Sequence, residues 1–256
     1  KFRAARRLWA TIMKERFGAT DEKALQCRFH VQTGGSTLSA QQIDNNVVRT
    51  TIQALSAVLG GAQSLHTNSK DEALGLPTND NVRIALRTQQ IIANETGIVE
   101  FPDPLGGSHV IEELTDKLAL EAQNIINEID NMGGAIAAIE AGWIQNQIAH
   151  SAYEYQKKVD TTDQVIVGVN KFKEKSKEGS QSHEIDSQAV NEQIKAVKKF
   201  KVDRDNNQVK TDLNKLISIA KDNNDNLLPS IIRCINSQCT LGEISDSLRS
   251  IFGEYN

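Results

Sequence analysis

The chain has 256 residues, of which 39% are hydrophobic and 24% charged, and its formal net charge is -4. A chain of this size and composition can bury a substantial core, and it has no run of about 18 apolar residues that would cross a bilayer. The slightly acidic balance argues against a dedicated nucleic-acid binder, whose domain is normally basic. We therefore expect neither nucleic acid nor a membrane as a partner.

The three cysteines, Cys27, Cys234 and Cys239, are an odd number without the spacing of a disulfide framework. Cys234 and Cys239 also lack the second His or Cys pair that a zinc site requires. Free thiols are typical of a reducing compartment, so we expect a cytoplasmic protein. The chain starts with Lys1 rather than Met, and we expect further sequence upstream of it.

The first hundred residues alternate between helical and strand patterns. An apolar stripe at helical spacing predicts a helix over residues 2–17, and residues 24–31 alternate as a strand does before the Gly34-Gly35 loop. A second helix, capped by Asp44 or Asn45, extends to Leu59. We expect its inward face to consist of Val47, Val48, Ile52, Leu55, Ala57 and Val58.

A second short strand over residues 64–67 runs into the polar loop that follows it. Asn68 or Ser69 can cap a short helix that Pro77 ends, and Asp71 lies in its first turn, where the helix dipole favours an anion. In such a helix Asn68 and Glu72 are four residues apart and share one face. A third helix is predicted from about residue 81 to residue 96.

Helix, strand, helix, strand and helix with short connections is the pattern of a parallel α/β barrel, whose sites lie at the carboxyl ends of the strands. Only two strands are visible here, so we predict the fold class as α/β, the carboxyl-terminal part of a TIM (β/α)8 barrel followed by a mostly α-helical region. The expected domains are 1–105, the last βα units of the barrel, and 106–256, a helical linker or docking region.

The second half of the chain is predicted to be helical. Long stripes predict a helix ended by Gly133-Gly134, a single helix from 135 to about 152, one short strand near 165–169 and an exposed linker over 173–184. The basic stretch from Lys195 to Arg204 is interpreted as a solvated helix face. Thr240 and Glu243 have the spacing of a capping box. The four last helices are expected near 188–200, 207–221, 227–236 and 241–253.

Several sequence blocks carry a resemblance to one enzyme family. His30-Val31-Gln32-Thr33-Gly34-Gly35, Asn45 to Thr50 and Gln63 to Thr78 occur in one order with the later blocks that begin at Asp103, Val165 and Cys239. Together they resemble the adenosylcobalamin-dependent acyl-CoA mutases, most closely the carboxyl-terminal portion of a large (alpha) subunit of the methylmalonyl-CoA mutase type. The resemblance implies a radical carbon-skeleton isomerisation of methylmalonyl-CoA to succinyl-CoA.

The resemblance also implies roles for particular residues. Glu72 matches the position that binds the ribose hydroxyls of the adenosyl group, and a carboxylate suits a diol because it accepts from both hydroxyls. Gln32 matches a glutamine above the corrin ring. No residue of this chain is expected to be catalytic or to bind a metal. The implied set is Gln32, Gly34, Gly35, Asn68 and Glu72 for the cofactor, and His30 and Gln63 for the acyl-CoA substrate.

Two departures from the full family pattern bear on partners. None of the five histidines lies in the Asp-x-His-x-x-Gly motif that supplies the cobalt ligand, so a separate domain or subunit must supply it. Ser36 stands where many relatives have tryptophan, as in the subgroup with separate large and small subunits. We therefore expect an acyl-CoA substrate, a small cobalamin-binding subunit and, as an open possibility, a dimer of large subunits, and we expect this piece to be inactive alone.

Three alternatives remain open. The residues that select the acyl group lie upstream of Lys1, so an isobutyryl- or hydroxyisobutyryl-CoA mutase large subunit fits equally well. The stripes after Ser108 fit a non-catalytic helical module for subunit docking. A barrel hydrolase or lyase with Glu72 as general acid or base is the third, although no second catalytic residue accompanies Glu72.

Overall fold

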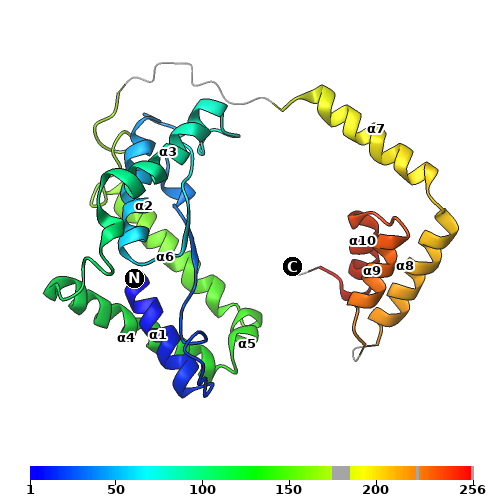
Figure 1. Cartoon of the computed structure of the whole chain (residues 1–256), viewed down its shortest axis with the longest axis horizontal. Coiled ribbons are helices and arrows are strands. Elements are labelled where there is room, and N and C mark those ends of the chain that lie inside the picture. The colour runs from blue at the N-terminus through cyan, green and yellow to red at the C-terminus, as the bar shows by residue number, and fades with distance from the viewer. Residues whose placement is uncertain (175–184, 223–224, 255–256) are drawn as a thin grey trace. The chain divides into compact units, whose positions relative to one another are not determined.

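The computed structural model describes residues 1–174, 185–222 and 225–254. The chain divides into two compact units, Lys1–Glu184 and Ile185–Asn256, which are described separately (Figure 1). This division falls later than the expected boundary between residues 105 and 106, because α1 (Phe2–Glu15) packs against α4 (His109–Asn131) across that boundary. The domain assignment of 1–105 and 106–256 stays a prediction.

A two-stranded parallel sheet lies in the first unit. β1 (His30–Gln32) pairs with β2 (Ser64–His66), so that Val31 is opposite Leu65. The strands lie where the alternating pattern predicts them, but the first is shorter, because residues 21–26 form successive turns instead of extended chain. The sheet agrees with the α/β class, whereas a TIM barrel is not formed by the described residues.

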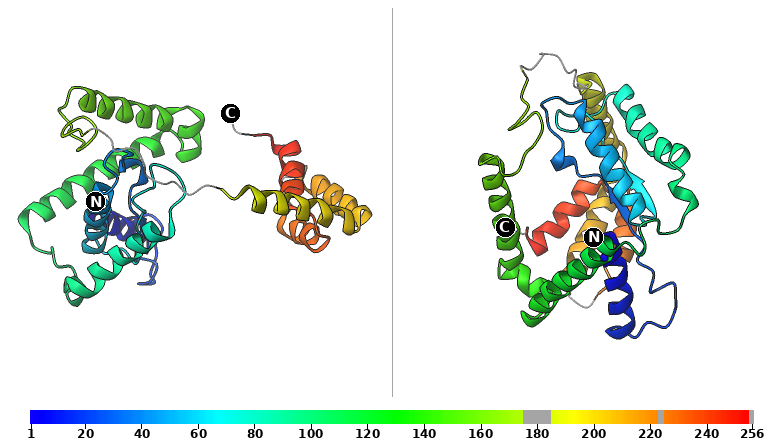
Figure 2. Two further views of the ribbon diagram at one scale, coloured as in Figure 1. Left: turned by 90° about the horizontal axis from the view of Figure 1, so that it is seen from above. Right: turned by 90° about the vertical axis from the view of Figure 1, so that its left-hand side faces the viewer.

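Helices pack beside this sheet in the first unit. α2 (Asn45–Leu59) packs against β2 and against α3 (Asn79–Glu95), and Figure 2 shows α2 and α3 beside the strands. The 3-10 turns η1 (Gly35–Thr37) and η2 (Ile98–Glu100) follow β1 and α3. The unit continues after α4 with α5 (Ala135–Glu140) and α6 (Trp143–Asp160).

The predicted inward face of α2 is wrong in part. Val48 and Ile52 are 59% and 62% exposed, and the buried positions are instead Asn46, Thr50, Ala54 and Ala57. This buried face carries small and polar side chains. The packing of α2 therefore depends on close approach and hydrogen bonding, which an apolar pattern does not reveal.

Three local predictions need correction. Residues 70–74 form turns rather than the short helix expected after Asn68. The single helix expected over 135–152 is interrupted by Gly142, which has a φ of 71° and separates α5 from α6. The strand expected at 165–169 is reduced to an isolated bridge at Val167, because the Asn170 side chain holds the Ile166 amide and the Gln164 carbonyl in a turn. Of the expected linker, residues 175–184 lie outside the described residues.

The second unit contains four helices in its described residues, close to the ranges predicted for them. They are α7 (Ser187–Asp203), α8 (Asn206–Ala220), α9 (Leu228–Asn236) and α10 (Leu241–Phe252). α8 packs against α9 and α10 around a core of Val209, Leu216, Cys234, Cys239 and Ile244.

All three cysteines are free thiols. Burial raises the pKa of the Cys234 thiol to about 11, which keeps it protonated and unreactive at neutral pH. In the described parts of the chain no helix has the length and apolar character to span a bilayer.

The capping box of α10 is confirmed. The Thr240 hydroxyl accepts from the Glu243 amide, and the Glu243 carboxylate accepts from the Thr240 amide at 2.8 Å. We expect Thr240→Ala to destabilise the second unit by about 1 kcal/mol, the usual cost of losing such a cap. Because buried Cys234 reacts when the core opens, its alkylation rate under native conditions should rise about fivefold in this variant. Thr240→Ser, which keeps the hydroxyl, is the control, and an equal increase for both variants would contradict the assignment.

Candidate functional site

One face of the two-stranded sheet is polar and exposed. His30 and Gln32 point to this face from β1, while Val31 points toward the helices. The His30 Nδ1 lies 2.8 Å from the Ser64 hydroxyl oxygen on β2. His66 is exposed on the same face of β2 and pairs in register with Gln32. The face therefore presents four hydrogen-bonding side chains side by side.

The loops after β1 and β2 meet at the carboxyl ends of the strands. Asn68 is only 2% exposed, and its backbone amide donates to the Thr33 hydroxyl at 2.9 Å. The Gln32 side-chain amide lies 3.2 Å from the Asn68 side-chain amide. The two loops that follow the strands are therefore in direct contact, and the ligand that the resemblance implies for them remains a prediction.

The Asn68 side chain can be oriented in two ways. In one orientation its oxygen accepts from Gln32 and from the Thr33 hydroxyl, both at 3.2 Å. In the other its oxygen accepts from the Gly35 amide at 3.2 Å, and its NH2 group donates to the Thr33 carbonyl at 3.3 Å. The second orientation satisfies both ends of the amide and ties the two loops together directly.

Gly35 leaves room that any side chain would fill. A Cβ atom there would come within 2.7 Å of the Asn68 terminal amide and 3.4 Å of the Glu72 Cγ and Oε1 atoms. Glu72 is exposed, so its carboxylate is available beside this backbone. At Gly34 the nearest contact of a Cβ would be an ordinary 3.4 Å. The structure thus brings together Gln32, Gly35, Asn68 and Glu72. Of the two glycines, Gly35 is the one at which a side chain would collide with Asn68.

Sequence reasoning missed the side chain that shapes the second loop. Asp71, expected in the first turn of a helix, is 1% exposed and accepts from the Thr78 amide at 3.0 Å and from the Asn81 side chain at 2.7 Å. The Ser69 hydroxyl donates to the same carboxylate. Asp71 therefore closes the loop onto the start of α3. The only hint in the sequence was an aspartate shortly before Thr78, the N-cap of α3. The short helix expected after Asn68 led us to place Asp71 in a helical turn instead.

A basic cavity of about 640 Å³ lies near Gln63. Gln63 is held by two backbone groups, since it accepts from the Phe29 amide at 2.7 Å and donates to the Gly61 carbonyl at 2.8 Å. Two carboxylates, Asp103 and Glu112, line the same cavity and both pair with Arg3. The excess of guanidinium groups favours an anionic ligand. The four arginines of the lining are Arg3, Arg6, Arg7 and Arg28.

The candidate site contains no constellation for acid–base or metal catalysis. Across residues 1–174, 185–222 and 225–254 no three His, Cys, Asp or Glu side chains gather in a way that could hold a metal ion. Among the described residues, no hydrogen bond or ion pair joins the Glu72 carboxylate to a second carboxylate or to a base. The arrangement is therefore suited to binding and orienting a ligand.

Comparison with known proteins identifies the family of the chain. The sequence profile of the family described as methylmalonyl-CoA mutase matches residues 1–254. The chain is 44% identical over 256 residues to the 2-hydroxyisobutanoyl-CoA mutase large subunit of Aquincola tertiaricarbonis, covering all of this chain and 46% of that protein. It is 46% identical over 254 residues to methylmalonyl-CoA mutase of Escherichia coli (strain K12), covering 99% of this chain and 35% of that protein.

A third relative is the mitochondrial methylmalonyl-CoA mutase of Homo sapiens, at 43% identity over all 256 residues and 34% of that protein. These matches establish the family of the chain that contains the polar sheet face and its two loops. The chain belongs to the methylmalonyl-CoA mutase family. It spans between 34% and 46% of the length of these relatives.

Proposed function

We propose that this chain is part of an adenosylcobalamin-dependent acyl-CoA mutase that isomerises methylmalonyl-CoA to succinyl-CoA. The observation that carries the proposal is the meeting of Gly35, Asn68 and Glu72 at the carboxyl ends of two parallel strands. Ligands of parallel α/β folds bind at these ends. In this reading residues 1–105 are the last βα units of a TIM barrel, and residues 106–256 are the helical linker or docking region.

The residues of the site fit the nucleoside part of such a cofactor. When bound, adenosylcobalamin supplies radical chemistry, and the protein binds, orients and shields the reacting groups. The exposed Glu72 carboxylate would accept from the two ribose hydroxyls, and Asn68 holds the loop beside it. Gly35 leaves the space that a side chain would occupy, and Gln32 and Gly34 border the same loop.

The polar sheet face and the basic cavity support an acyl-CoA substrate. His30 is exposed on that face, and Gln63 lines the cavity with its four arginines. The phosphates of coenzyme A are anions that guanidinium groups bind well. We assign His30 and Gln63 to the substrate. Because the Aquincola relative is described as a 2-hydroxyisobutanoyl-CoA mutase large subunit, hydroxyisobutyryl-CoA and isobutyryl-CoA are alternative substrates.

The cobalt ligand is assigned to a separate domain or to a small cobalamin-binding subunit, because no Asp-x-His-x-x-Gly motif occurs in the sequence. Ser36 at the glycine loop favours the two-subunit arrangement, and one relative is itself described as a large subunit. A dimer of large subunits and a cytoplasmic location remain predictions.

Replacing Glu72 with glutamine in the complete enzyme tests the proposal. We expect adenosylcobalamin to bind about 10- to 100-fold more weakly, because a hydrogen bond to a charged acceptor is worth about 1.5–3 kcal/mol. Titration of the cofactor, followed by absorbance, measures the dissociation constant. Glu95→Gln, at an exposed carboxylate in the last turn of α3, is the matched control. Equal affinities for the Glu72 and Glu95 variants would refute the assigned role.

A helical docking module is the second candidate, and one observation favours it. Every residue of α7 is exposed, including the apolar Val190, Ile194 and Val197, which recur at helical spacing. A 17-residue helix without a buried face is marginal in water. Loss of subunit assembly with retained cofactor affinity in the Glu72→Gln enzyme would favour this candidate over the mutase site.

A further inference from the structure

One buried side chain of α2 contacts both loops of the candidate site. Asn46 is 0% exposed and makes four hydrogen bonds. Its NH2 group donates to the Ser39 carbonyl at 2.8 Å and to the Lys70 carbonyl at 2.9 Å. Its oxygen accepts from the Ser39 amide at 3.2 Å and from an Arg49 Nη1 at 2.7 Å. The donor and acceptor capacity of the amide is thereby fully used.

The two carbonyls that Asn46 holds belong to different loops. Ser39 follows Gly35 in the segment after β1, whereas Lys70 lies between Asn68 and Glu72 in the segment after β2. The loops also touch through Asn68 itself. Asn46 therefore links the backbone of the segment after Gly35 to the backbone two residues before Glu72, through a side chain that reaches no solvent.

Arg49 extends this support one helical turn further along α2. The Arg49 Nη1 also donates to the Ser39 hydroxyl at 3.1 Å, and its Nη2 donates to the Val167 carbonyl at 2.8 Å. The turn at Val167 is thus connected to the glycine loop through Arg49 and Asn46. A planar guanidinium with fixed donor directions can hold these three acceptors together, which a lysine cannot.

We propose that Asn46 is a positioning residue, which acts on cofactor binding through the relative placement of Gly35 and Glu72. This inference rests on the proposed function, because it takes those two residues as the nucleoside site. Removing the amide leaves the Lys70 carbonyl and both Ser39 backbone groups without this buried partner. The two loops then stay joined at Asn68 but lose their link at Lys70.

The test uses Asn46→Ala in the complete enzyme, with Asn45→Ala as the matched control. Asn45 is the preceding residue of the same helix, and its side chain donates to the Gln42 side chain at 2.8 Å rather than to either loop. We expect Asn46→Ala to weaken adenosylcobalamin binding at least tenfold while the KM for the acyl-CoA changes less than threefold. Asn45→Ala is expected to change neither quantity by more than twofold.

A second readout does not involve cofactor or activity. In the cofactor-free protein, hydrogen exchange of peptides covering residues 34–39 and 68–75 is expected to accelerate about tenfold in Asn46→Ala, with exchange in α8 unchanged. Arg49→Lys serves if Asn46→Ala does not fold, with a smaller acceleration in the same two peptides. Unchanged exchange in both peptides, or an equal rise in KM and cofactor dissociation constant, would overturn the inference.

The proposed function and the positioning role of Asn46 can be refuted separately. If Glu72→Gln leaves cofactor affinity unchanged, the proposed function fails whatever Asn46 does. If Glu72→Gln weakens binding but Asn46→Ala behaves like Asn45→Ala, the site stands and the positioning role is refuted. If Asn46 acts through Glu72, the double variant Asn46→Ala, Glu72→Gln is expected to lose less affinity than the sum of the two single losses.

Discussion

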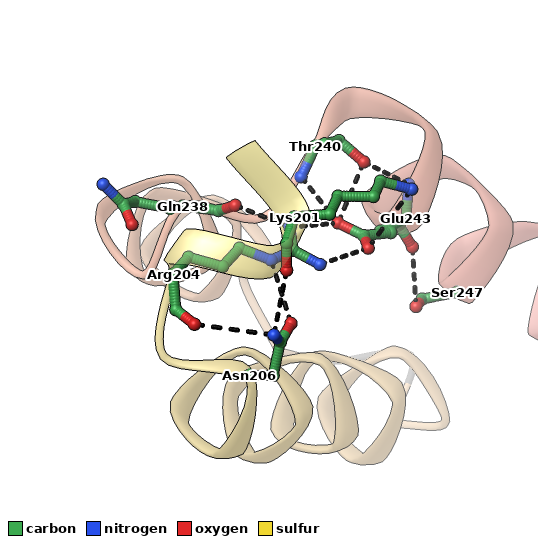
Figure 3. A network of polar contacts seen from close by, with 7 residues as sticks. All are labelled: Lys201, Arg204, Asn206, Gln238, Thr240, Glu243 and Ser247. Carbon is green, nitrogen blue, oxygen red and sulfur yellow. Dashed lines mark hydrogen bonds and ion pairs between the residues drawn. The ribbon is translucent and has the colours of Figure 1, made fainter. Parts of the chain in front are cut away.

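Replacing Arg204 with alanine is expected to destabilise the second unit by about 3 kcal/mol, because it removes one partner of a largely buried ion pair. The Arg204 side chain is 4% exposed, and its Nη1 donates to the Glu243 carboxylate at 2.7 Å and to the Gln238 carbonyl at 2.8 Å. Figure 3 shows these contacts joining the end of α7 to the start of α10. The expectation that residues 195–204 form a solvated face is therefore wrong for Arg204.

The alkylation rate of Cys234 measures this destabilisation, because the thiol is 0% exposed and reacts only when the core opens. A loss of about 3 kcal/mol corresponds to a roughly 100-fold faster reaction. Arg249→Ala is the matched control, since Arg249 is 48% exposed and pairs with the exposed Asp246. We expect that variant to lose less than about 1 kcal/mol. Similar rates in the two variants would contradict the energetic role of the Arg204 pair.

The same pair predicts a pH dependence. Hydrogen bonding to Arg204 holds the pKa of Glu243 well below its ordinary value of 4.5, and Lys201 lies 3.5 Å from the same carboxylate. A carboxyl group whose pKa is lower in the folded than in the unfolded state stabilises the folded protein at pH values above the unfolded-state pKa. This stabilisation is lost as the pH falls toward the folded-state pKa. The difference in the free energy of unfolding between the wild-type protein and Arg204→Ala should therefore be constant from about pH 7 to 6 and should shrink below about pH 4.5. The hydrogen bonds of Gln208 and Ser237 also lower the pKa of Asp212, but this effect is common to both proteins.

In the first unit the largest functional effect is expected from Gly35→Ala. The new Cβ atom would lie 2.7 Å from the Asn68 amide, and Asn68 is too well buried and hydrogen-bonded to move aside freely. Gly35 does not have a positive φ, so alanine suits the backbone and the effect is a steric one at the loop contact. We expect cofactor affinity to fall by up to roughly 100-fold, because forcing an extra methyl group into a packed contact costs about 1–3 kcal/mol.

Cofactor titration of the complete enzyme checks this result. Gly242→Ala is the control, because a Cβ at that position meets nothing within 4 Å. Thermal unfolding of the Gly35→Ala protein separates a local change from a global one. Retained cofactor affinity in Gly35→Ala would show that the loop does not approach the ligand closely.

The helices of this chain follow from local signals in the sequence. The bounds of α4, α8 and α10 agree with their apolar stripes and end residues, and the Thr240–Glu243 box was predicted correctly. These features depend on residues within a few positions of one another, so a single sequence contains the needed information. The pairing of residues 30–32 with 64–66 was also anticipated, because two strands with a helix between them form a parallel pair.

The family of the protein, most of its helices and the two polar loops after the strands could be predicted from the sequence. The burial of Asn46 and Asp71 at those loops, and of Arg204 beside Glu243, could be found only from the folded arrangement of the chain. Each of these polar side chains is stabilised by partners 7 to 39 residues away. Such partners are brought together by packing, so hydrophobic periodicity, which reports only the apolar face of a local segment, cannot locate them.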